Sequence, residues 1–262
     1  MTMLHVGDLE MYYETLGSGD PVLLLHGLGS SSKGWVLQRE PFAARHHVIL
    51  TDLRGHGRTD RPPGPYSVPM FAGDVLGLLD ALELRAVNVV GLSMGGMVGF
   101  QLAVDHPDRV KSLVAVNAGP ALVPSTLRDR FGLWQRRILV NLLPMGKIAD
   151  TIGNRLFPEP GQAEFLRLFK EGFLENDKAG YKAATRALIG WSVADRIDRI
   201  SCPVLVVSAD QDYTPVSAKQ EFVSRMPTAR LAVVEHSHHA TPIDQAETFN
   251  ELVLSFLAQV DR

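Results

Sequence analysis

Cysteine and a surplus of charge of either sign are what this sequence most clearly lacks. Its 262 residues include one cysteine, Cys202, which excludes an intramolecular disulfide and a cysteine-based metal site. Lys and Arg total 26 against 29 Asp and Glu, so the net charge is −3 with neutral His. A protein that binds nucleic acid needs a basic excess to neutralise phosphates, and no run of Lys or Arg provides one locally. We therefore expect no nucleic-acid partner.

Long apolar runs are also missing. No stretch approaches the roughly 20 apolar residues that are needed to cross a bilayer. Residues 1–13 have neither the basic stretch nor the apolar centre of a signal peptide. These features predict a cytoplasmic protein with no membrane partner. The content of 45% hydrophobic and 21% charged residues is that of an ordinary globular protein, and a chain of this length buries a large core.

Short apolar runs recur along the chain, and segments with helical spacing separate them. The predicted strands cover residues 9–13, paired antiparallel with 3–6, and then 21–25, 47–50, 87–90, 113–116, 203–207 and 230–234. Near-continuous runs of β-branched residues and Leu are typical of parallel strands that are buried on both faces. Helical patterns cover 71–84, 95–106 and 246–260. This alternation predicts an α/β fold with a doubly wound, mostly parallel sheet of about eight strands.

One stretch interrupts the alternation. Between about Ala121 and Gly190 the patterns are helical only, and prolines at 124, 144, 158 and 160 favour helix boundaries. We interpret this stretch as an insertion between two strands, either a cap over the sheet or a second small domain. The predicted organisation is a core of residues 1–120 and 191–262 with a helical cap (lid) at 121–190.

The segment Gly91-Leu-Ser-Met-Gly95 carries the strongest chemical signal. The bare pattern is weak, but here it follows a predicted strand and opens a predicted helix. A sharp strand-to-helix turn strains its central residue and leaves no room for side chains two positions before and after, which explains the glycines. Such a turn presents the hydroxyl of Ser93 above the carboxyl ends of the strands. The alternative is a tight turn with an incidental serine.

A serine at neutral pH needs a base to become a nucleophile, and the base needs an orienting acid. On this fold the expected chain order is Ser, then Asp or Glu, then His. Among nine histidines, those late enough are His236, His238 and His239, directly beyond the last predicted strand. Asp210 and Asp212, just past the preceding strand, are the candidate acids. A zinc site on the clustered histidines is an alternative, but no acidic residue has suitable spacing, so we predict no metal.

Together these motifs resemble the α/β-hydrolase superfamily over essentially the whole chain. The matching segments are His26–Gly29, Asp52–Gly57, the turn around Ser93, Asp210–Pro215 and His239–Asp244. In that family the acid usually stands two residues after the aspartate that follows the strand, which implies Asp212. The catalytic histidine usually lies five residues before an acidic residue, which implies His239. His238 stands where the family commonly has Gly, and it stays an alternative base.

The resemblance also implies the rest of the site. An oxyanion hole requires two backbone N–H groups directed at developing negative charge, and in this family they would belong to Leu28 and Met94. His239 would take the proton of Ser93 as it attacks an acyl carbon, while Asp212 fixes the imidazole tautomer. Water would then hydrolyse the acyl-enzyme. No cofactor is implied, and we interpret the two histidines in the first two matching segments as loop anchors.

The substrate is less well defined. Apolar aromatic residues in or next to the cap, Trp134, Phe157 and Trp191, are predicted to line an acyl or alkyl pocket, although such residues more often pack cap helices onto a core. The 3-oxoadipate enol-lactone hydrolases tend to lack His-Gly at the oxyanion loop, so His26-Gly27 favours a serine carboxylesterase for small to medium esters, as a monomer or homodimer. Lactone or enol-lactone hydrolysis is the alternative. Further alternatives are cofactor-free perhydrolysis, carbon–carbon bond hydrolysis and a non-catalytic role as a ligand receptor.

Overall fold

The computed structural model describes residues 2–124 and 126–260, without the side chains of residues 128, 129, 136 and 137. One sheet of eight strands forms its centre, in the order β1-β2-β4-β3-β5-β6-β7-β8. The strands are β1 Thr2–Val6, β2 Leu9–Leu16, β3 Pro21–Leu25, β4 His47–Thr51, β5 Val87–Leu92, β6 Val110–Val116, β7 Val204–Ala209 and β8 Ala229–Val234. β2 pairs antiparallel with both β1 and β4, and the neighbours from β4 to β8 are parallel. The predicted mostly parallel sheet is therefore confirmed.

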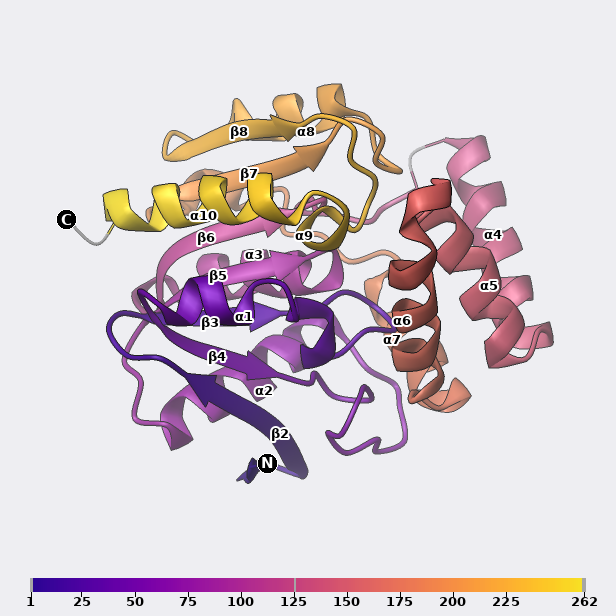
Figure 1. Ribbon diagram of the computed structural model, residues 1–262, viewed down its shortest axis with the longest axis horizontal. Helices are drawn as coiled ribbons and strands as arrows, with labels where there is room; N and C mark the ends of the chain where they lie inside the picture. Colours follow the sequence, from indigo (N-terminus) through magenta and orange to yellow (C-terminus); the bar gives the residue numbers. More distant parts are fainter. Residues whose placement is uncertain (1, 125, 261–262) are drawn as a thin grey trace.

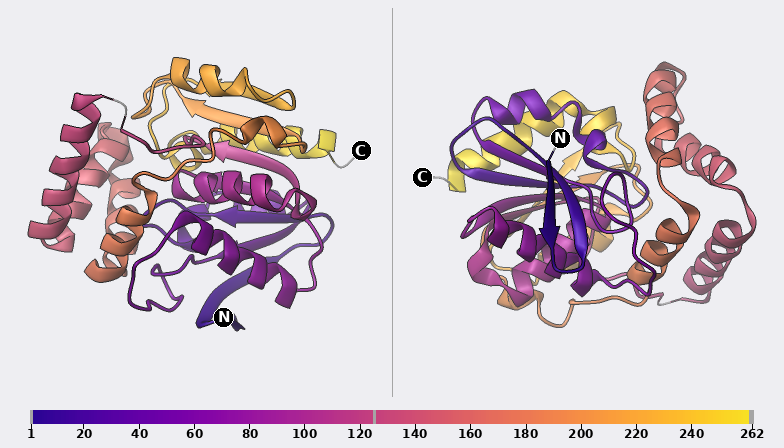
Figure 2. Two further views of the ribbon diagram at one scale, coloured as in Figure 1. Left: turned by 180° about the vertical axis from the view of Figure 1, so that it is seen from behind. Right: turned by 90° about the horizontal axis from the view of Figure 1, so that it is seen from below.

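Helices cover both faces of this sheet. They are α1 Arg39–Ala43, α2 Val68–Ala81, α3 Met94–Asp105, α8 Val216–Val223, α9 Thr241–Asp244 and α10 Ala246–Val260, with short 3-10 helices at Ser32–Trp35, Pro107–Arg109 and Ile197–Arg199. Figure 1 shows α1 and α10 in front of the sheet, and Figure 2 shows α2 and α3 behind it. Side chains of successive residues in β5 point to opposite faces of the sheet. Val89 lies in the apolar cluster under α2 and α3, and Val90 lies in the cluster under α10.

The expectation that every apolar run is buried on both faces is wrong for residues 230–234. They form most of β8, the edge strand, in which Val233 is 45% exposed. Arg230 is exposed as well, and its guanidinium lies over the ring of Phe256 in α10, 5.1 Å from the centroid. An edge strand has a neighbour on one side only, so the covering helices reach part of its surface and leave the rest to solvent.

Between β6 and β7, the described part of residues 121–190 forms four α-helices and a 3-10 helix at Pro160–Gln162. The α-helices are α4 Leu127–Leu142, α5 Met145–Leu156, α6 Ala163–Leu174 and α7 Lys178–Leu188. The two ends of this helical insertion meet, because Ala121 and Ser192 form an antiparallel bridge and the N–H of Leu122 donates to the carbonyl of Trp191 at 2.9 Å. Figure 1 shows the insertion at the end of the sheet toward which the parallel strands point. The carboxyl ends of the strands therefore face the insertion.

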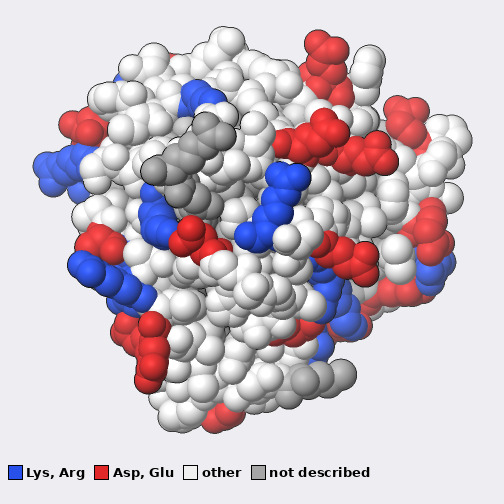
Figure 3. Space-filling view, turned by 60° about the vertical axis from the view of Figure 1, so that its left-hand side comes forward, with Lys and Arg blue, Asp and Glu red and all other residues white. Residues whose placement is uncertain are grey.

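The surface carries both signs of charge. On the face drawn in Figure 3, Lys and Arg side chains alternate with Asp and Glu, and neither sign forms a continuous patch there. Among residues 2–124 and 126–260, no helix combines the length and the apolar character that spanning a bilayer requires.

Candidate active site

Ser93 lies in the turn between β5 and α3. Its backbone adopts φ 52° and ψ −110°, a region that costs an L residue of order 1–3 kcal/mol. The neighbouring glycines are required sterically, because a Cβ at Gly95 would lie 2.1 Å from the carbonyl oxygen of Leu25, and one at Gly91 would lie 2.3 Å from the carbonyl carbon of Gly95. The N–H of Ser93 donates to the carbonyl of Val116 at 2.8 Å. Close packing and this hydrogen bond hold the strained turn.

The structure pairs His239 with Asp212. Nδ1 of His239 is 2.5 Å from Oδ1 of Asp212. Burial raises the pKa of Asp212, but the hydrogen bonds and charges of His239 and Lys219 outweigh burial and lower the pKa to about 2. The carboxylate is therefore ionised and accepts, so Nδ1 carries the ring proton and Nε2 is left as an acceptor. The ring of Tyr213 stacks on the imidazole, with the centroids 4.5 Å apart and 26° between the planes.

Asp210, the other candidate acid, holds the turn that precedes His239. Its two carboxylate oxygens accept the backbone N–H groups of residues 236–237 at 3.0 Å each. Burial raises its pKa, and these hydrogen bonds lower it by more. Asp244 accepts the backbone N–H of His238, the next residue of this turn, at 2.6 Å. This hydrogen bond explains why an acidic residue stands five positions after the histidine, because Asp244 fixes the backbone that carries His239.

Asn117 connects the turn of Ser93 with the acid and histidine loops. It follows Val116, whose carbonyl accepts from Ser93. Its side-chain oxygen accepts the N–H of Ala209 in β7 at 2.8 Å, and its side-chain nitrogen donates to the carbonyl of His239 at 2.9 Å. Asn117 is buried and has φ 47°, a conformation that Asn adopts more readily than most residues. No motif marks it, but its position at the end of β6, between β5 and β7, is a usable signal.

Leu28 and Met94, the predicted oxyanion donors, belong to segments that meet at Ser93. Met94 directly follows the serine and begins α3. Gly27, the residue before Leu28, lies against the serine, because a Cβ at Gly27 would be 3.6 Å from the Cβ of Ser93. The fold therefore brings together the loop after β3, the turn after β5 and the loops after β7 and β8.

His26 anchors the loop that carries Leu28. Its Nε2 accepts the N–H of Leu53 at 2.9 Å, and its Nδ1 lies 2.8 Å from the carbonyl of Gly27. Because Nε2 accepts, Nδ1 must carry the proton, and both ring nitrogens are engaged. Burial lowers the pKa of His26, and burial together with the neighbouring His26 lowers the pKa of His56 to about 3. Both rings are therefore neutral and buried, as loop anchors should be.

The helical insertion packs against the loops on both sides of Ser93. Phe173 of α6 belongs to an apolar cluster against which Leu28 packs, and Phe157 belongs to the same apolar cluster as Ala240, the residue after His239. Asn176, just past α6, donates a 3.0 Å hydrogen bond to the carbonyl of residue 29. These contacts place α5 and α6 over the carboxyl edge of the sheet, beside the segments that converge on the serine.

The three aromatic residues predicted to line a pocket lie in different surroundings. Phe157 is buried next to the loop of His239. Trp134 is 56% exposed on α4. Trp191 is buried in the core, where its indole N–H donates to Oε1 of Gln101 in α3 at 2.7 Å. Of these three residues, the structure brings Phe157 to the candidate active site, and the contacts of Trp191 are those of a core residue.

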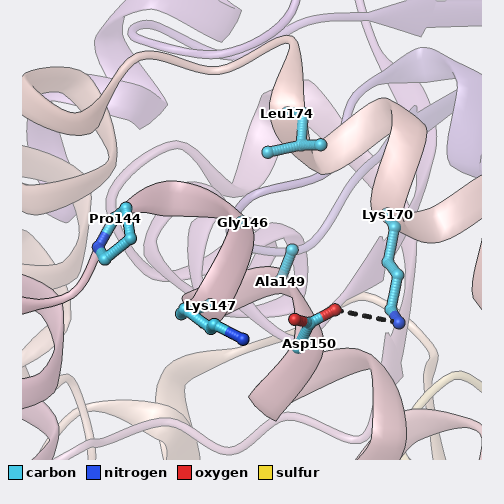
Figure 4. A pocket seen from close by; sticks show the side chains of 7 residues that line it. All are labelled: Pro144, Gly146, Lys147, Ala149, Asp150, Lys170 and Leu174. Carbon is cyan, nitrogen blue, oxygen red and sulfur yellow. Dashed lines mark ion pairs between the residues drawn. The ribbon is translucent and has the colours of Figure 1, made fainter.

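A hollow of about 320 Å³ lies between α5 and α6. Its lining consists of Pro144, Gly146, Lys147, Ala149, Asp150, Lys170 and Leu174 (Figure 4). Two of these lining residues, Lys170 and Asp150, form an ion pair with 2.9 Å between Nζ and Oδ1. Ser93, Asp212 and His239 do not line this hollow, so it is separate from the candidate active site. Within residues 2–124 and 126–260, no three side chains of His, Cys, Asp or Glu form a group that could hold a metal ion.

A family model described as "alpha/beta hydrolase fold" matches residues 20–246 of this chain. The chain belongs to the α/β-hydrolase fold family. The resemblance predicted from the five sequence segments is thereby confirmed, and the site described above lies within the matched residues of this α/β hydrolase.

Relatives of this α/β hydrolase carry several hydrolase names. The protein named "Putative carbamate hydrolase RutD" of Azorhizobium caulinodans is 32% identical over 100% of both chains. 3-Oxoadipate enol-lactonase 2 of Acinetobacter baylyi is 31% identical, with 94% of this chain and 92% of the relative covered. The crystal structure of the enol-lactonase from Burkholderia xenovorans LB400 superposes with a TM-score of 0.90 at 27% identity, covering 98% of this chain and 100% of that chain. These similarities identify a hydrolase of the enol-lactonase-like branch.

Proposed function

We propose that this α/β hydrolase cleaves carboxylic esters through an acyl-enzyme on Ser93. One observation carries the proposal, the 2.5 Å hydrogen bond between Nδ1 of His239 and Asp212. This hydrogen bond leaves Nε2 of His239 as the proton acceptor. Asn117 holds the loop of His239 at the end of β6, and β6 is also hydrogen-bonded to the turn of Ser93 through the carbonyl of Val116. A nucleophile, a base and an orienting acid are the minimum that acyl transfer to a serine requires.

The reaction follows from these roles. His239 takes the hydroxyl proton as Oγ of Ser93 bonds to the acyl carbon, and the N–H groups of Leu28 and Met94 stabilise the resulting oxyanion, each worth about 3–4 kcal/mol. Collapse of this intermediate breaks the ester bond, and the imidazolium returns the proton to the departing alcohol oxygen. Water, deprotonated by the same histidine, then attacks the acyl carbon; the bond to Oγ of Ser93 breaks, Oγ takes the proton back from the imidazolium, and the carboxylic acid is released. Each step uses residues of this chain and water.

The helical insertion serves in this proposal as a cap over the active site. Its contacts with Leu28 on one side and Ala240 on the other support this role. Phe157, packed against the histidine loop, is the aromatic residue that we assign to the wall of the acyl pocket. A substrate would then be enclosed between the carboxyl edge of the sheet and the insertion, which limits the length of acyl group that fits.

Lactone or enol-lactone hydrolysis is the second candidate. The observation that favours it is the similarity to proteins named enol-lactonase, in sequence at 31% identity and in structure at a TM-score of 0.90. A lactone is a cyclic ester, so the same attack by Ser93 opens it, and the alcohol stays attached to the acyl group instead of leaving. Chemistry at the serine is common to both substrates, and the shape of the space under the insertion decides between them.

Initial rates on a substrate panel test the proposal. The panel contains p-nitrophenyl esters of increasing chain length, simple lactones, an enol-lactone and an alkyl carbamate. Ser93→Ala is the loss-of-function variant, and Ser217→Ala, at an exposed position of α8, is its matched control. A chain-length optimum that disappears only in Ser93→Ala supports an esterase, and activity confined to lactones supports the second candidate. Hydrolysis that survives in Ser93→Ala would refute both candidates.

A further inference from the structure

A lysine side chain is buried directly behind the candidate acid. Lys219 lies in α8, and its side chain is 2% exposed. Its Nζ donates to Oδ2 of Asp212 at 2.5 Å, to Oγ1 of Thr214 at 2.9 Å and to the carbonyl of Thr214 at 3.1 Å. An ammonium has three donors, and all three are used here. Lysine is almost never fully buried unless it is paired, so this burial requires Asp212.

The two oxygens of the Asp212 carboxylate have different partners. Oδ2 accepts from Lys219 and from the hydroxyl of Thr214, which is 2.9 Å away. Oδ1 faces Nδ1 of His239. Because two donors hold Oδ2, the carboxylate cannot rotate without losing both hydrogen bonds, and Oδ1 stays directed at the imidazole. The positive charge of Lys219 also offsets part of the negative charge that would otherwise stabilise the imidazolium.

We propose that Lys219 is a positioning residue of the triad, which fixes the rotation of the Asp212 carboxylate and sets the pH range in which His239 can act as a base. This inference rests on the proposed function. It has two separable parts, a geometric one carried by the hydrogen bond to Oδ2 and an electrostatic one carried by the charge. Among the described residues, Lys219 supplies the positive charge that is bonded to the acid itself.

The other titratable groups around His239 act from different places. Asp210 accepts backbone N–H groups of the histidine turn, and Nδ1 of His238 lies 3.9 Å from Asp244. Tyr213 stacks on the ring of His239. These groups bind the turn or the ring face and leave the carboxylate of the acid to Lys219 and Thr214. Variants of Lys219 therefore change the charge next to the acid while they leave the histidine turn intact.

Two substitutions separate the geometric part from the electrostatic part. Lys219→Met removes the charge and the donor on a side chain of similar length, whereas Lys219→Gln removes the charge and keeps an amide donor. A unit charge within about 4–6 Å of a titrating group shifts its pKa by about one to three. Because the carboxylate of Asp212 lies between Lys219 and His239, we expect the effect on the imidazole to be near the lower end of that range. We expect the acidic limb of kcat/KM to move up by about one pH unit in both variants, because the imidazolium faces a less neutralised carboxylate. We expect kcat on the plateau to fall about tenfold in Lys219→Met and less in Lys219→Gln.

A second lysine provides a matched control. Lys111 also pairs with an aspartate, Asp20, at 2.5 Å, but these side chains are 35% and 42% exposed and lie at the amino ends of the strands. Lys111→Met should leave both kcat and the pH profile unchanged. An unmoved acidic limb in both Lys219 variants would overturn the electrostatic part, and an unchanged plateau kcat in Lys219→Met would overturn the geometric part.

A double-mutant cycle tests whether Lys219 acts through Asp212. In an Asp212→Asn background the carboxylate charge is gone, and the amide of Lys219→Gln keeps a donor for the carboxamide oxygen, so Lys219→Gln should change kcat/KM less than twofold. An equal loss in both backgrounds would show a general structural effect and overturn the inference. Fluorophosphonate labelling separates this failure from failure of the proposed function. If Ser93 is labelled and required for hydrolysis while the Lys219 variants keep the wild-type pH profile, only the inference about Lys219 is wrong. If hydrolysis continues without Ser93, both the proposed function and this inference are wrong.

Discussion

Asp212→Asn should reverse the position of the proton on His239. A carboxamide offers one acceptor oxygen and one donor NH2 in place of two acceptor oxygens. Lys219 and the hydroxyl of Thr214 both donate to the Oδ2 side, so the carboxamide oxygen must take that side. The NH2 group then faces Nδ1 of His239, which lies 2.5 Å from Oδ1 of the native carboxylate. Nδ1 becomes an acceptor, and the ring proton moves to Nε2, the nitrogen that has to accept from Ser93.

The expected losses can be worked out from this geometry. A histidine in the wrong tautomer costs about 10⁴ in kcat in a serine triad. Folding stability falls as well, because Lys219 is left without its counter-charge, and breaking a buried ion pair costs roughly 3–5 kcal/mol. Lys219 and Asp212 are both almost fully buried, so solvent screens this pair little. At about 2–4 °C per kcal/mol for a chain of this size, the unfolding midpoint should fall by roughly 6–20 °C.

Asp210→Asn is the matched control, since it makes the same chemical change two residues away. The carboxylate of Asp210 accepts two backbone N–H groups, and a carboxamide can keep one of them. We expect a loss of stability of about 1–3 kcal/mol and a loss in kcat of less than about tenfold. Steady-state rates on a p-nitrophenyl ester and thermal unfolding measure both effects. The reasoning is refuted if Asp210→Asn loses more activity than Asp212→Asn, or if Asp212→Asn stays within about tenfold of wild type.

Three further predictions concern the strained turn and the acid. Ser93→Gly should abolish labelling by a fluorophosphonate, and it should raise the free energy of unfolding by about 1 kcal/mol because glycine adopts the φ of 52° without strain. Denaturant unfolding measures the change in stability, and a less stable variant would contradict the prediction. Gly95→Ala should prevent stable folding, since its Cβ would lie 2.1 Å from the carbonyl oxygen of Leu25; a wild-type melting curve would disprove the steric argument. The pKa of Asp212, lowered from 3.8 to about 2, should contribute about 2 kcal/mol of stability above pH 4 that is lost as the pH falls toward 2. Denaturant unfolding from pH 6 to pH 2 should therefore show a steeper loss in wild type than in Asp212→Asn, and parallel curves would exclude this contribution.

The central strands are predictable because apolar residues fill most of each one, with Asn88 as an interruption in β5, and each apolar run ends at a polar residue or glycine. Residues 22–25 are fully buried, and the run stops at His26. Boundaries are less predictable where polar residues stand inside a strand. β6 begins at Val110, three residues before its apolar run, because Lys111 reaches solvent and Ser112 is buried beside Asn88. Residues 110–112 belong to β6 because this stretch pairs with a neighbouring strand, and a pattern based on apolar residues alone does not predict this extension.

The candidate triad is predictable from the position of each member after a strand, whereas the residues that support it are not. A lysine in a short helix is ordinarily interpreted as exposed, and nothing in the local sequence around Lys219 contradicts that. Its burial depends on the carboxylate of Asp212, seven residues earlier, turning toward it. The core hydrogen bond of Trp191 is unpredictable for a related reason. Its partner, Gln101, is ninety residues away in the chain.

The order of the strands explains how these separate segments become one site. β5, β6, β7 and β8 are neighbours in the sheet, so the turn of Ser93, the acid loop and the histidine loop emerge side by side at one edge. β6 ends between β5 and β7, so the carbonyl of Val116 accepts from Ser93 on one side, and the side chain of Asn117 bonds to Ala209 and His239 on the other. The helical insertion leaves the core shortly after Asn117 and returns before β7. Its two ends thus rise between the serine and the acid, which explains why α5 and α6 lie over this edge of the sheet.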